Sequence, residues 1–380
     1  MDRLQWFRER LRREKLDAVL VSAPSNVAYL TRFRAVTYTR PVFLVVGQEP
    51  ALVLPTLELE HARSAWHAGE FRPYGDEQLG GVGGRSPFDL ALDEVVRAMR
   101  QQGLNRPGRR VGLEAGGLTW EGYSRLAQAL DCELVATRGL VEEARLVKDE
   151  QEVGCLRSAA KLADCGMAVE VAATRPGITE LEVMAEGDRA MLLEASRRLP
   201  ELVVSVGSRP VSGPKSALPH ALTSARLLEA GDVVLHGTGA VVEGYGCEVE
   251  RTMFLGGPND QARAAFLAAV KAQWAGIEAI RPGVACCQVD RVCRRVIADA
   301  GLERFILHRS GHGMGLDVHE APYLAESDDT VLRPGMGVSV EPGVYIPGLG
   351  GFRHSDTVLV TPAGAECLTR YPRELERLVR

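Results

Sequence analysis

Residues 231–256, "GDVVLHGTGAVVEGYGCEVERTMFLG", decide which fold this chain can adopt. Two strand-like apolar runs flank a turn at Glu243 and Gly244, a pattern typical of a β-hairpin. Because side chains alternate between the two faces of a strand, Glu248 and Glu250 should project on the same face. The stretch therefore predicts a long hairpin that carries two carboxylates on one side.

The composition points to a two-domain protein with a small substrate. The chain has 380 residues, of which 46% are hydrophobic and 25% charged, which is enough to bury the cores of two domains. Its net charge of -5 comes from interspersed acidic and basic residues, so neither nucleic acid nor a membrane surface is indicated. The N-terminus lacks the apolar run of a signal peptide or membrane span, and the cysteines lack zinc-site spacing. We expect a cytoplasmic protein that acts on a small molecule or a short peptide.

The hydrophobic patterns predict a boundary at residue 145. Residues 1–145 alternate β-rich runs with helical candidates, which is typical of a small α/β domain. Residues 146–380 mix long helices with strand pairs, which indicates an α+β domain with helices on one face of a curved antiparallel sheet. Helices are expected at 56–68, 86–102, 119–130, 150–174, 178–196, 258–280 and 286–301, and C-terminal strands at 202–206, 233–240, 246–254, 338–345 and 354–360.

Imidazole and carboxylate groups are concentrated in the last quarter of the chain. "HRSGHGMGLDVHEAP" (308–322) contains His308, His312 and His319, and "SVEPGVY" (339–345) contains Glu341. "GGFRHSDTVLVT" (350–361) adds Arg353. The intervening glycines let a substrate or a neighbouring strand come close to the backbone. This density predicts a functional site rather than scattered core or surface residues.

Four segments in this order resemble the signature of the pita-bread hydrolases, the family of methionine aminopeptidase, aminopeptidase P, prolidase and creatinase. They are "VSGPKSALPH", "GHGMGLDVHEAP", "VEPGVY" and "RHSDTVLVT". The N-terminal "SNVAYLTRF" and the linker "ARLVKDEQEV" resemble the branch that contains creatinase, prolidase and aminopeptidase P. The resemblance covers nearly the whole chain. It implies a pita-bread domain preceded by a creatinase-type α/β domain, and a homodimer.

The peptidases of this family hold two divalent metal ions with two Asp, one His and two Glu. At these positions the resemblance places Gly237, Glu248, His312, Glu341 and Ser355. Glycine offers no ligand and serine a poor neutral one, so we expect no dinuclear centre and no cofactor. A single Mn, Zn or Co ion on Glu248, His312 and Glu341 is the alternative. His236 and His354 adjoin lost ligands, but strand alternation should turn them to the opposite face.

Creatinase works without a metal, and several positions resemble it. The resemblance implies catalytic roles for His220, Glu250 and Glu341, and a grip of Arg40 on the substrate carboxylate across the dimer. We also expect the substrate-binding residues to include His308, His312, His319 and Arg353. Two carboxylates on one face can hold a guanidinium, amidinium or ammonium group while an imidazole moves a proton. "RHSD" and Tyr323 depart from creatinase, so only the reaction class carries over.

Three functions remain open on the sequence. We expect first a creatinase-like hydrolase of a C–N bond in a small carboxylate-bearing substrate, without a dinuclear metal centre. The second is a peptidase that resembles Xaa-Pro dipeptidase or aminopeptidase P and has a degraded or single-metal site. The third is a catalytically silent pita-bread domain that binds peptides or a partner protein.

Overall fold

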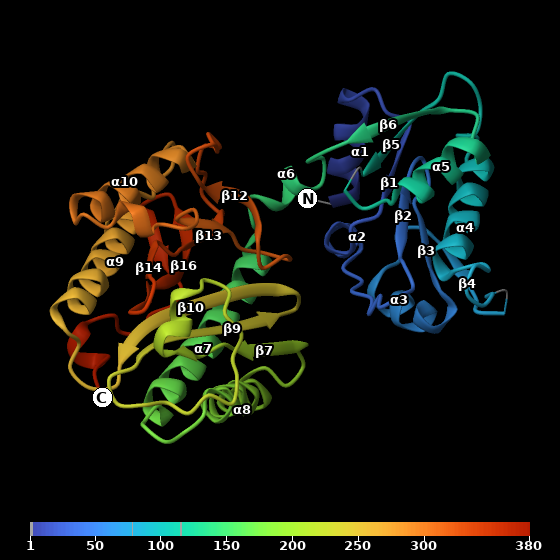
Figure 1. The fold of residues 1–380 in the computed structure, drawn as a ribbon. Coiled ribbons are helices and arrows are strands. Elements are labelled where there is room, and N and C mark those ends of the chain that lie inside the picture. Colours follow the sequence, from blue (N-terminus) through green and yellow to red (C-terminus); the bar gives the residue numbers. More distant parts are fainter. Residues whose placement is uncertain (1–2, 78, 115) are drawn as a thin grey trace. The chain divides into compact units, whose positions relative to one another are not determined.

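The computed structural model describes residues 3–77, 79–114 and 116–380, and the chain divides into two units at residue 145. The first unit ends at Arg145, and the second spans Leu146–Arg380. Figure 1 colours the first unit from blue to green and the second from green to red.

The first unit is a mixed sheet with helices. Its strands are β1 (Ala18–Val21), β2 (Phe43–Val46), β3 (Ala51–Pro55), β4 (Glu70–Tyr74), β5 (Arg110–Glu114) and β6 (Glu133–Thr137). Its helices are α1 (Arg3–Arg13), α2 (Pro24–Thr31), α3 (Leu59–Ala65), α4 (Pro87–Gln101), α5 (Trp120–Ala129) and α6 (Glu142–Arg145). The strand order is β4-β3-β2-β1-β5-β6, in which β1 pairs antiparallel with β2 and parallel with β5. The predicted α/β character is confirmed.

Local signals set the helix ends in this unit. α4 begins with a capping box, in which the Ser86 hydroxyl accepts from the Asp89 N–H (3.2 Å) and the Asp89 carboxylate accepts from the Ser86 N–H (2.7 Å). The helix expected over 56–68 is shorter. Residues Thr56–Glu58 form a 3₁₀ turn before α3, and α3 ends where Trp66 turns extended and buries its ring edge-on against Phe71.

The second unit carries the long hairpin. Its strands are β7 (Val204–Ser208), β8 (Val211–Ser212), β9 (Val233–Val242), β10 (Tyr245–Phe254), β11 (Gly311–Gly313), β12 (Glu320–Leu324), β13 (Gly337–Val340), β14 (Gly343–Ile346), β15 (Gly350–Arg353), β16 (Ser355–Thr361) and β17 (Gly364–Cys367). Its helices are α7 (Glu150–Ala173), α8 (Glu180–Arg198), α9 (Asp260–Ala279) and α10 (Cys286–Asp299). The main sheet has the order β12-β11-β13-β16-β10-β9-β7, with β17 beside β16 and β8 beside β9.

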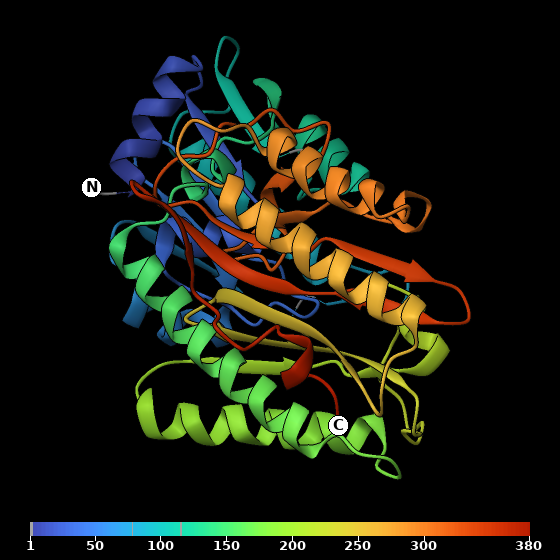
Figure 2. The same cartoon turned by 90° about the vertical axis from the view of Figure 1, so that its left-hand side faces the viewer.

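Helices cover one face of this antiparallel sheet. α7 packs against β9 and β10, and α9 contacts β13, β14 and β15. Figure 2 shows α7 in green and α9 in orange, both lying across the sheet. A sheet with one covered face presents polar residues on the other. The predicted α+β arrangement is confirmed. No helix in the part of the chain that the structure describes combines the length and apolar character that a membrane crossing requires.

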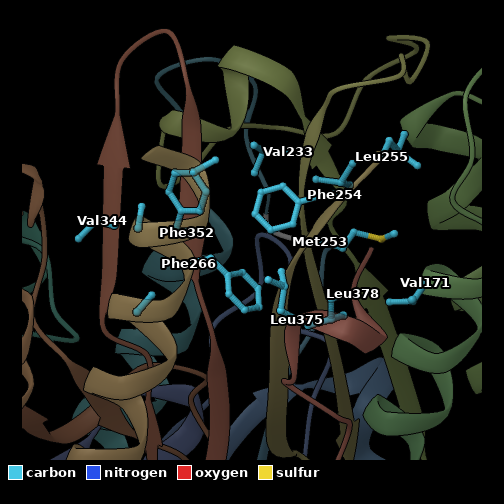
Figure 3. Packing of buried hydrophobic residues seen from close by; sticks show 14 of the residues in the cluster. Val171, Val233, Met253, Phe254, Leu255, Phe266, Val344, Phe352, Leu375 and Leu378 are labelled. Carbon is cyan, nitrogen blue, oxygen red and sulfur yellow. The ribbon is translucent and has the colours of Figure 1, made fainter. Parts of the chain in front are cut away.

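Large apolar side chains fill the space between sheet and helices (Figure 3). The ring of Phe254 on β10 lies 5.6 Å from Phe266 on α9 and 6.3 Å from Phe352 on β15, measured between centroids. The C-terminal tail adds Leu375 and Leu378 to the same buried cluster. Each such side chain stabilises the fold by roughly 1.5–3 kcal/mol relative to exposure. The tail is therefore part of the core that supports β10.

The strand expected over 338–345 is broken in the structure. β13 ends at Val340 and β14 begins at Gly343, with Glu341 and Pro342 between them. The prediction of one strand was wrong because Pro342 has no N–H to donate to the ladder. As a result, β14 leaves the main sheet and pairs with β15 in a separate hairpin.

A buried guanidinium ties the tail to the hairpin. Arg251 is fully buried, pairs with Asp356 at 2.9 Å and donates from Nε to the Tyr371 and Pro372 carbonyls. Nη1 donates to the Ser355 carbonyl at 2.8 Å. A buried charge with several satisfied donors is costly to remove, because its partners remain behind without compensation.

We predict that Arg251→Met lowers the free energy of unfolding by about 3 kcal/mol or more, because it strands Asp356 and several carbonyls in the core. The measurement is denaturant unfolding followed by circular dichroism. Arg291→Met is the matched control, since Arg291 makes an exposed pair with Glu326 and its loss should hardly move the transition. Equal effects of the two changes would contradict the prediction.

Candidate functional site

Strand alternation in the hairpin separates a helix-facing side from an open side. The Thr238 hydroxyl donates to the Ala163 carbonyl of α7 (2.9 Å), so Thr238 faces the helices. Its neighbour Gly237 therefore lies on the other face, where Glu250 is its cross-strand partner. Glu248 shares that face with Glu250, as the sequence predicted.

Glu248 and Glu341 converge on the imidazole of His312. His312 Nε2 lies 3.3 Å from Glu341 Oε1 and 3.6 Å from Glu248 Oε1. The Ser355 hydroxyl donates to Glu248 Oε1 (3.2 Å), and the Ser339 hydroxyl accepts from the His312 N–H (3.0 Å). These contacts join β10, β11 and β16 with the break between β13 and β14.

The two carboxylates hold protons with opposite strength. Burial, and then the charge of Glu341, raises the pKa of Glu248 to about 8. Burial alone would raise the pKa of Glu341, but the neighbouring His312 and Arg353 lower it to about 2. Burial alone would lower the pKa of His312, but Glu341 and Glu248 raise it. At neutral pH the site therefore contains an ion pair of Glu341 with His312 beside a protonated Glu248.

His319 completes this group from the exposed side. Its ring centroid lies 3.9 Å from that of His312, and its side chain is exposed whereas His312 is buried. Burial, and then the charge on His312, lowers the pKa of His319 to about 4, with His220 acting in the same direction. One donor atom each from Glu248, His312 and His319 lies within 4.8 Å of the others. The three side chains can share one ion or one path for a proton.

Glu250 is paired with a guanidinium of the protein itself. Arg353 Nη2 donates to Glu250 Oε1 at 2.6 Å, and Arg353 Nε faces Glu250 Oε2. Arg353 Nη1 donates to the Tyr345 hydroxyl (2.9 Å) and to the Pro219 carbonyl (3.4 Å). The Tyr345 hydroxyl also contacts His308 Nε2 at 2.8 Å. Burial alone would lower the pKa of Arg353, but Glu250 raises it well above its ordinary value, so the pair is ionic.

Comparison with known proteins agrees with this architecture. The model of metallopeptidase family M24 matches residues 154–362, and that of the creatinase/prolidase N-terminal domain matches residues 3–147. The chain belongs to metallopeptidase family M24. The pita-bread resemblance is thereby confirmed.

Relatives of this M24 protein are similar over their whole length. The "putative dipeptidase YkvY" of Bacillus subtilis is 32% identical over 382 residues, which cover 99% of each chain. An Xaa-Pro dipeptidase of Pyrococcus horikoshii is 29% identical, with 96% of this chain and 95% of the relative covered. The structure of an Xaa-Pro dipeptidase from Bacillus anthracis superposes with a TM-score of 0.86 at 31% identity, covering 99% of both chains.

These relatives correct the preference for creatinase. Creatinase enters the comparison through the N-terminal domain model alone, whereas the full-length relatives are dipeptidases. The structure supplies a physical reason. The carboxylate of Glu250, expected to hold a guanidinium of the substrate, already holds that of Arg353.

The M24 family name implies metal, but the residues present do not fit a dinuclear centre. Gly237 has no donor atom, and a Cβ placed on it would lie 3.3 Å from Glu250 Oε1. Ser355 offers a hydroxyl that donates to Glu248 rather than a carboxylate. The guanidinium of Arg353 adds a positive charge beside these positions. For a single ion, the donor atoms gathered closely are those of Glu248, His312 and His319, so His319 takes the place expected for Glu341.

The structure distributes the other predicted residues unequally. Arg353, expected to bind substrate, is engaged in an internal ion pair, and both ring nitrogens of His308 have protein partners, the Tyr345 hydroxyl and the Arg309 carbonyl. His220 is exposed and near enough to His319 to influence its pKa. Arg40 pairs with Asp76 within the first unit, and its action across a dimer stays a prediction. Tyr345 was missed, because a tyrosine after a Glu-Pro turn carries no distinctive signal in the sequence.

His236 and His354 lie behind the sheet, as strand alternation required. His236 Nδ1 contacts Glu170 Oε2 of α7 at 2.8 Å. His354 is fully buried, and its ring packs edge-on against Phe266 of α9 with 4.7 Å between centroids. Neither imidazole can replace a lost ligand on the open face.

His354 should make the fold sensitive to acid. Burial, reinforced by the charges of Arg251 and Arg373, holds the pKa of His354 well below its ordinary value. The unfolded chain therefore binds a proton that the folded chain refuses, so stability is fully present above about pH 6.5 and falls as the pH drops below it. The slope from this group is at most about 1.4 kcal/mol per pH unit.

We predict that His354→Phe, which keeps a flat ring against Phe266, flattens the loss of stability between about pH 6.5 and 4.5. Thermal unfolding at a series of pH values measures it. His61→Phe, at an exposed histidine, should leave the wild-type slope in place. An unchanged slope in His354→Phe would show that other groups account for the acid sensitivity.

Proposed function

We propose that this M24 protein hydrolyses the C–N bond of a dipeptide with proline in the second position. The observation that carries the proposal is the group of Glu248, His312 and His319, whose donor atoms lie within 4.8 Å of one another. Xaa-Pro dipeptidases similar over at least 95% of this chain support peptides of this size as the substrates. The site differs from a dinuclear one, so the chemistry rests on side chains that move protons.

Hydrolysis of a prolyl amide needs a base for water and an acid for the leaving nitrogen. His319, on the exposed side of the group, takes a proton from the water that attacks the carbonyl carbon. The carboxyl group of Glu248 gives a proton to the proline nitrogen as the C–N bond breaks. After the products leave, the proton on His319 returns to Glu248. The ion pair of His312 with Glu341 holds both groups in place.

The arrangement of Glu250 argues against a guanidinium substrate. A creatine-like molecule would have to displace Arg353, which makes two contacts to Glu250 and further ones to Tyr345 and Pro219. Bidentate pairs of this kind are among the stronger charge-assisted contacts. A dipeptide needs no such displacement, since it carries an ammonium group and a carboxylate but no guanidinium.

Substrate contacts are proposed for the exposed histidines. His220 and His319 are both exposed, and their mutual influence on pKa indicates that they are neighbours. Imidazole N–H groups can donate to the peptide carbonyl or to the terminal carboxylate. Arg40 would add a charge for the carboxylate only in a homodimer.

We predict that His319→Ala and Glu248→Gln each lower kcat/KM on Xaa-Pro dipeptides by about 100-fold or more, since each removes one half of the proton transfer. Proline release measures the rate, and circular dichroism checks the fold. His354→Phe is the matched control, because that imidazole faces α9 and should leave the rate unchanged.

A wild-type protein that cleaves no Xaa-Pro dipeptide, with or without added Mn²⁺, Zn²⁺ or Co²⁺, would overturn the proposal. Calorimetry with the same dipeptides then distinguishes a silent peptide-binding domain, which binds them, from a hydrolase of another substrate class, which does not. Retained activity in His319→Ala would exclude His319 as the base.

A further inference from the structure

We propose that Arg353, held by Glu250 over Gly237, is a cation built into the site in place of a second metal ion, so that the site accepts at most one divalent ion. The inference deepens the proposed dipeptidase function, on which its meaning for catalysis rests. Its structural content concerns which side chains exclude one another, and this can be tested without substrate.

Gly237 and Glu250 compete for one space. They are cross-strand partners in the β9 to β10 ladder. A Cβ at position 237 would meet Oε1, Cγ and Cδ of Glu250 at 3.3, 3.6 and 3.9 Å. A longer side chain at 237 would therefore extend into the volume that the Glu250 carboxylate fills. The carboxylate of this part of the hairpin stands on β10, and glycine on β9 leaves the room for it.

The guanidinium of Arg353 is fixed beside that carboxylate. The side chains of Arg353 and Glu250 are 12% and 13% exposed, so their attraction is little screened by solvent. Contacts from Nη1 to the Tyr345 hydroxyl and the Pro219 carbonyl anchor the other side of the guanidinium. A divalent cation beside it would be repelled by a charge that cannot be neutralised by losing a proton.

Room for one ion remains on the other side of the site. His312 is wholly buried, and its Nε2 has no well-aligned hydrogen bond although it lies 3.3 Å from Glu341 and 3.6 Å from Glu248. A buried imidazole nitrogen without a bonded partner is suited to a metal ligand. With Glu248 and His319 nearby, it offers the ligands of one ion and not of two.

The first test is a double-mutant cycle on stability. Glu250→Thr should lower the thermal midpoint by roughly 5 °C or more, because it leaves a buried Arg353 without its partner. Gly237→Asp should also lower it, because its carboxylate is forced against Glu250. The double variant Gly237→Asp with Glu250→Thr should recover most of the loss, since the aspartate at 237 replaces the missing partner of Arg353.

The matched control uses the neighbouring glycine on the same face. A Cβ at Gly239 would also meet its nearest atom at 3.3 Å, but that atom is the Cys247 carbonyl oxygen and not Glu250. Gly239→Asp combined with Glu250→Thr should therefore show additive losses. Should the double change at 237 and 250 be additive as well, the exchange of carboxylates is refuted. If Glu250→Thr does not fold, Glu250→Gln replaces it in the cycle.

The second test counts metal ions. Calorimetric titration of the wild-type protein with Mn²⁺ and with Zn²⁺, followed by elemental analysis after dialysis, should give no more than one equivalent per chain. Glu248→Gln should weaken any binding that is seen by about 10-fold or more. Two retained equivalents in the wild-type protein would overturn the proposal. Neither test uses activity, so a failure of dipeptide hydrolysis and a failure of this inference are separate results.

Discussion

The register of the β9 to β10 hairpin is the constraint on which the rest of the site depends. A two-residue turn at Glu243 and Gly244, both with positive φ, fixes which residues stand opposite one another. A slip of one residue would move every side chain of β10 to the other face. Glu248 and Glu250 would then enter the helix-covered core, and Arg251 would enter the site. The apolar cluster around Phe254 and the buried pair of Arg251 with Asp356 make that slip costly.

Charge balance explains how three glutamates can share one face without a metal. Arg353 compensates Glu250, a protonated His312 compensates Glu341, and Glu248 retains its proton because its pKa is raised. Each cation comes from a different strand or turn, so neutralisation is completed only when the sheet has closed. The same balance separates this chain from the M24 proteins that its family name describes, because a built-in guanidinium has taken a place beside the carboxylates.

The helix-facing side of the sheet holds these strands in position. Arg251 and Asp356 link β10, β16 and the C-terminal tail, and Gln273 of α9 donates to the same Asp356 carboxylate at 2.8 Å. Glu170 and His236 link α7 to β9. Such satisfied buried networks restrict side chains to one arrangement. The open face can therefore carry unbalanced acid and base groups while the opposite face keeps the strands from shifting.

The sequence by itself determined the family, the class of each unit and the face on which each site residue lies, because motif order and strand periodicity are local properties. It placed Glu248 and Glu250 on one face and turned His236 and His354 away, and the turn at Glu243 and Gly244 also contained the register that sets Glu250 opposite Gly237. Only the tertiary structure decided which partners those side chains meet. Arg353 reaches Glu250 from 103 residues further along the chain, and His319 joins Glu248 through β11 and β12. Such pairings depend on strand order and on the break at Pro342, and these follow from packing between distant segments rather than from any local pattern.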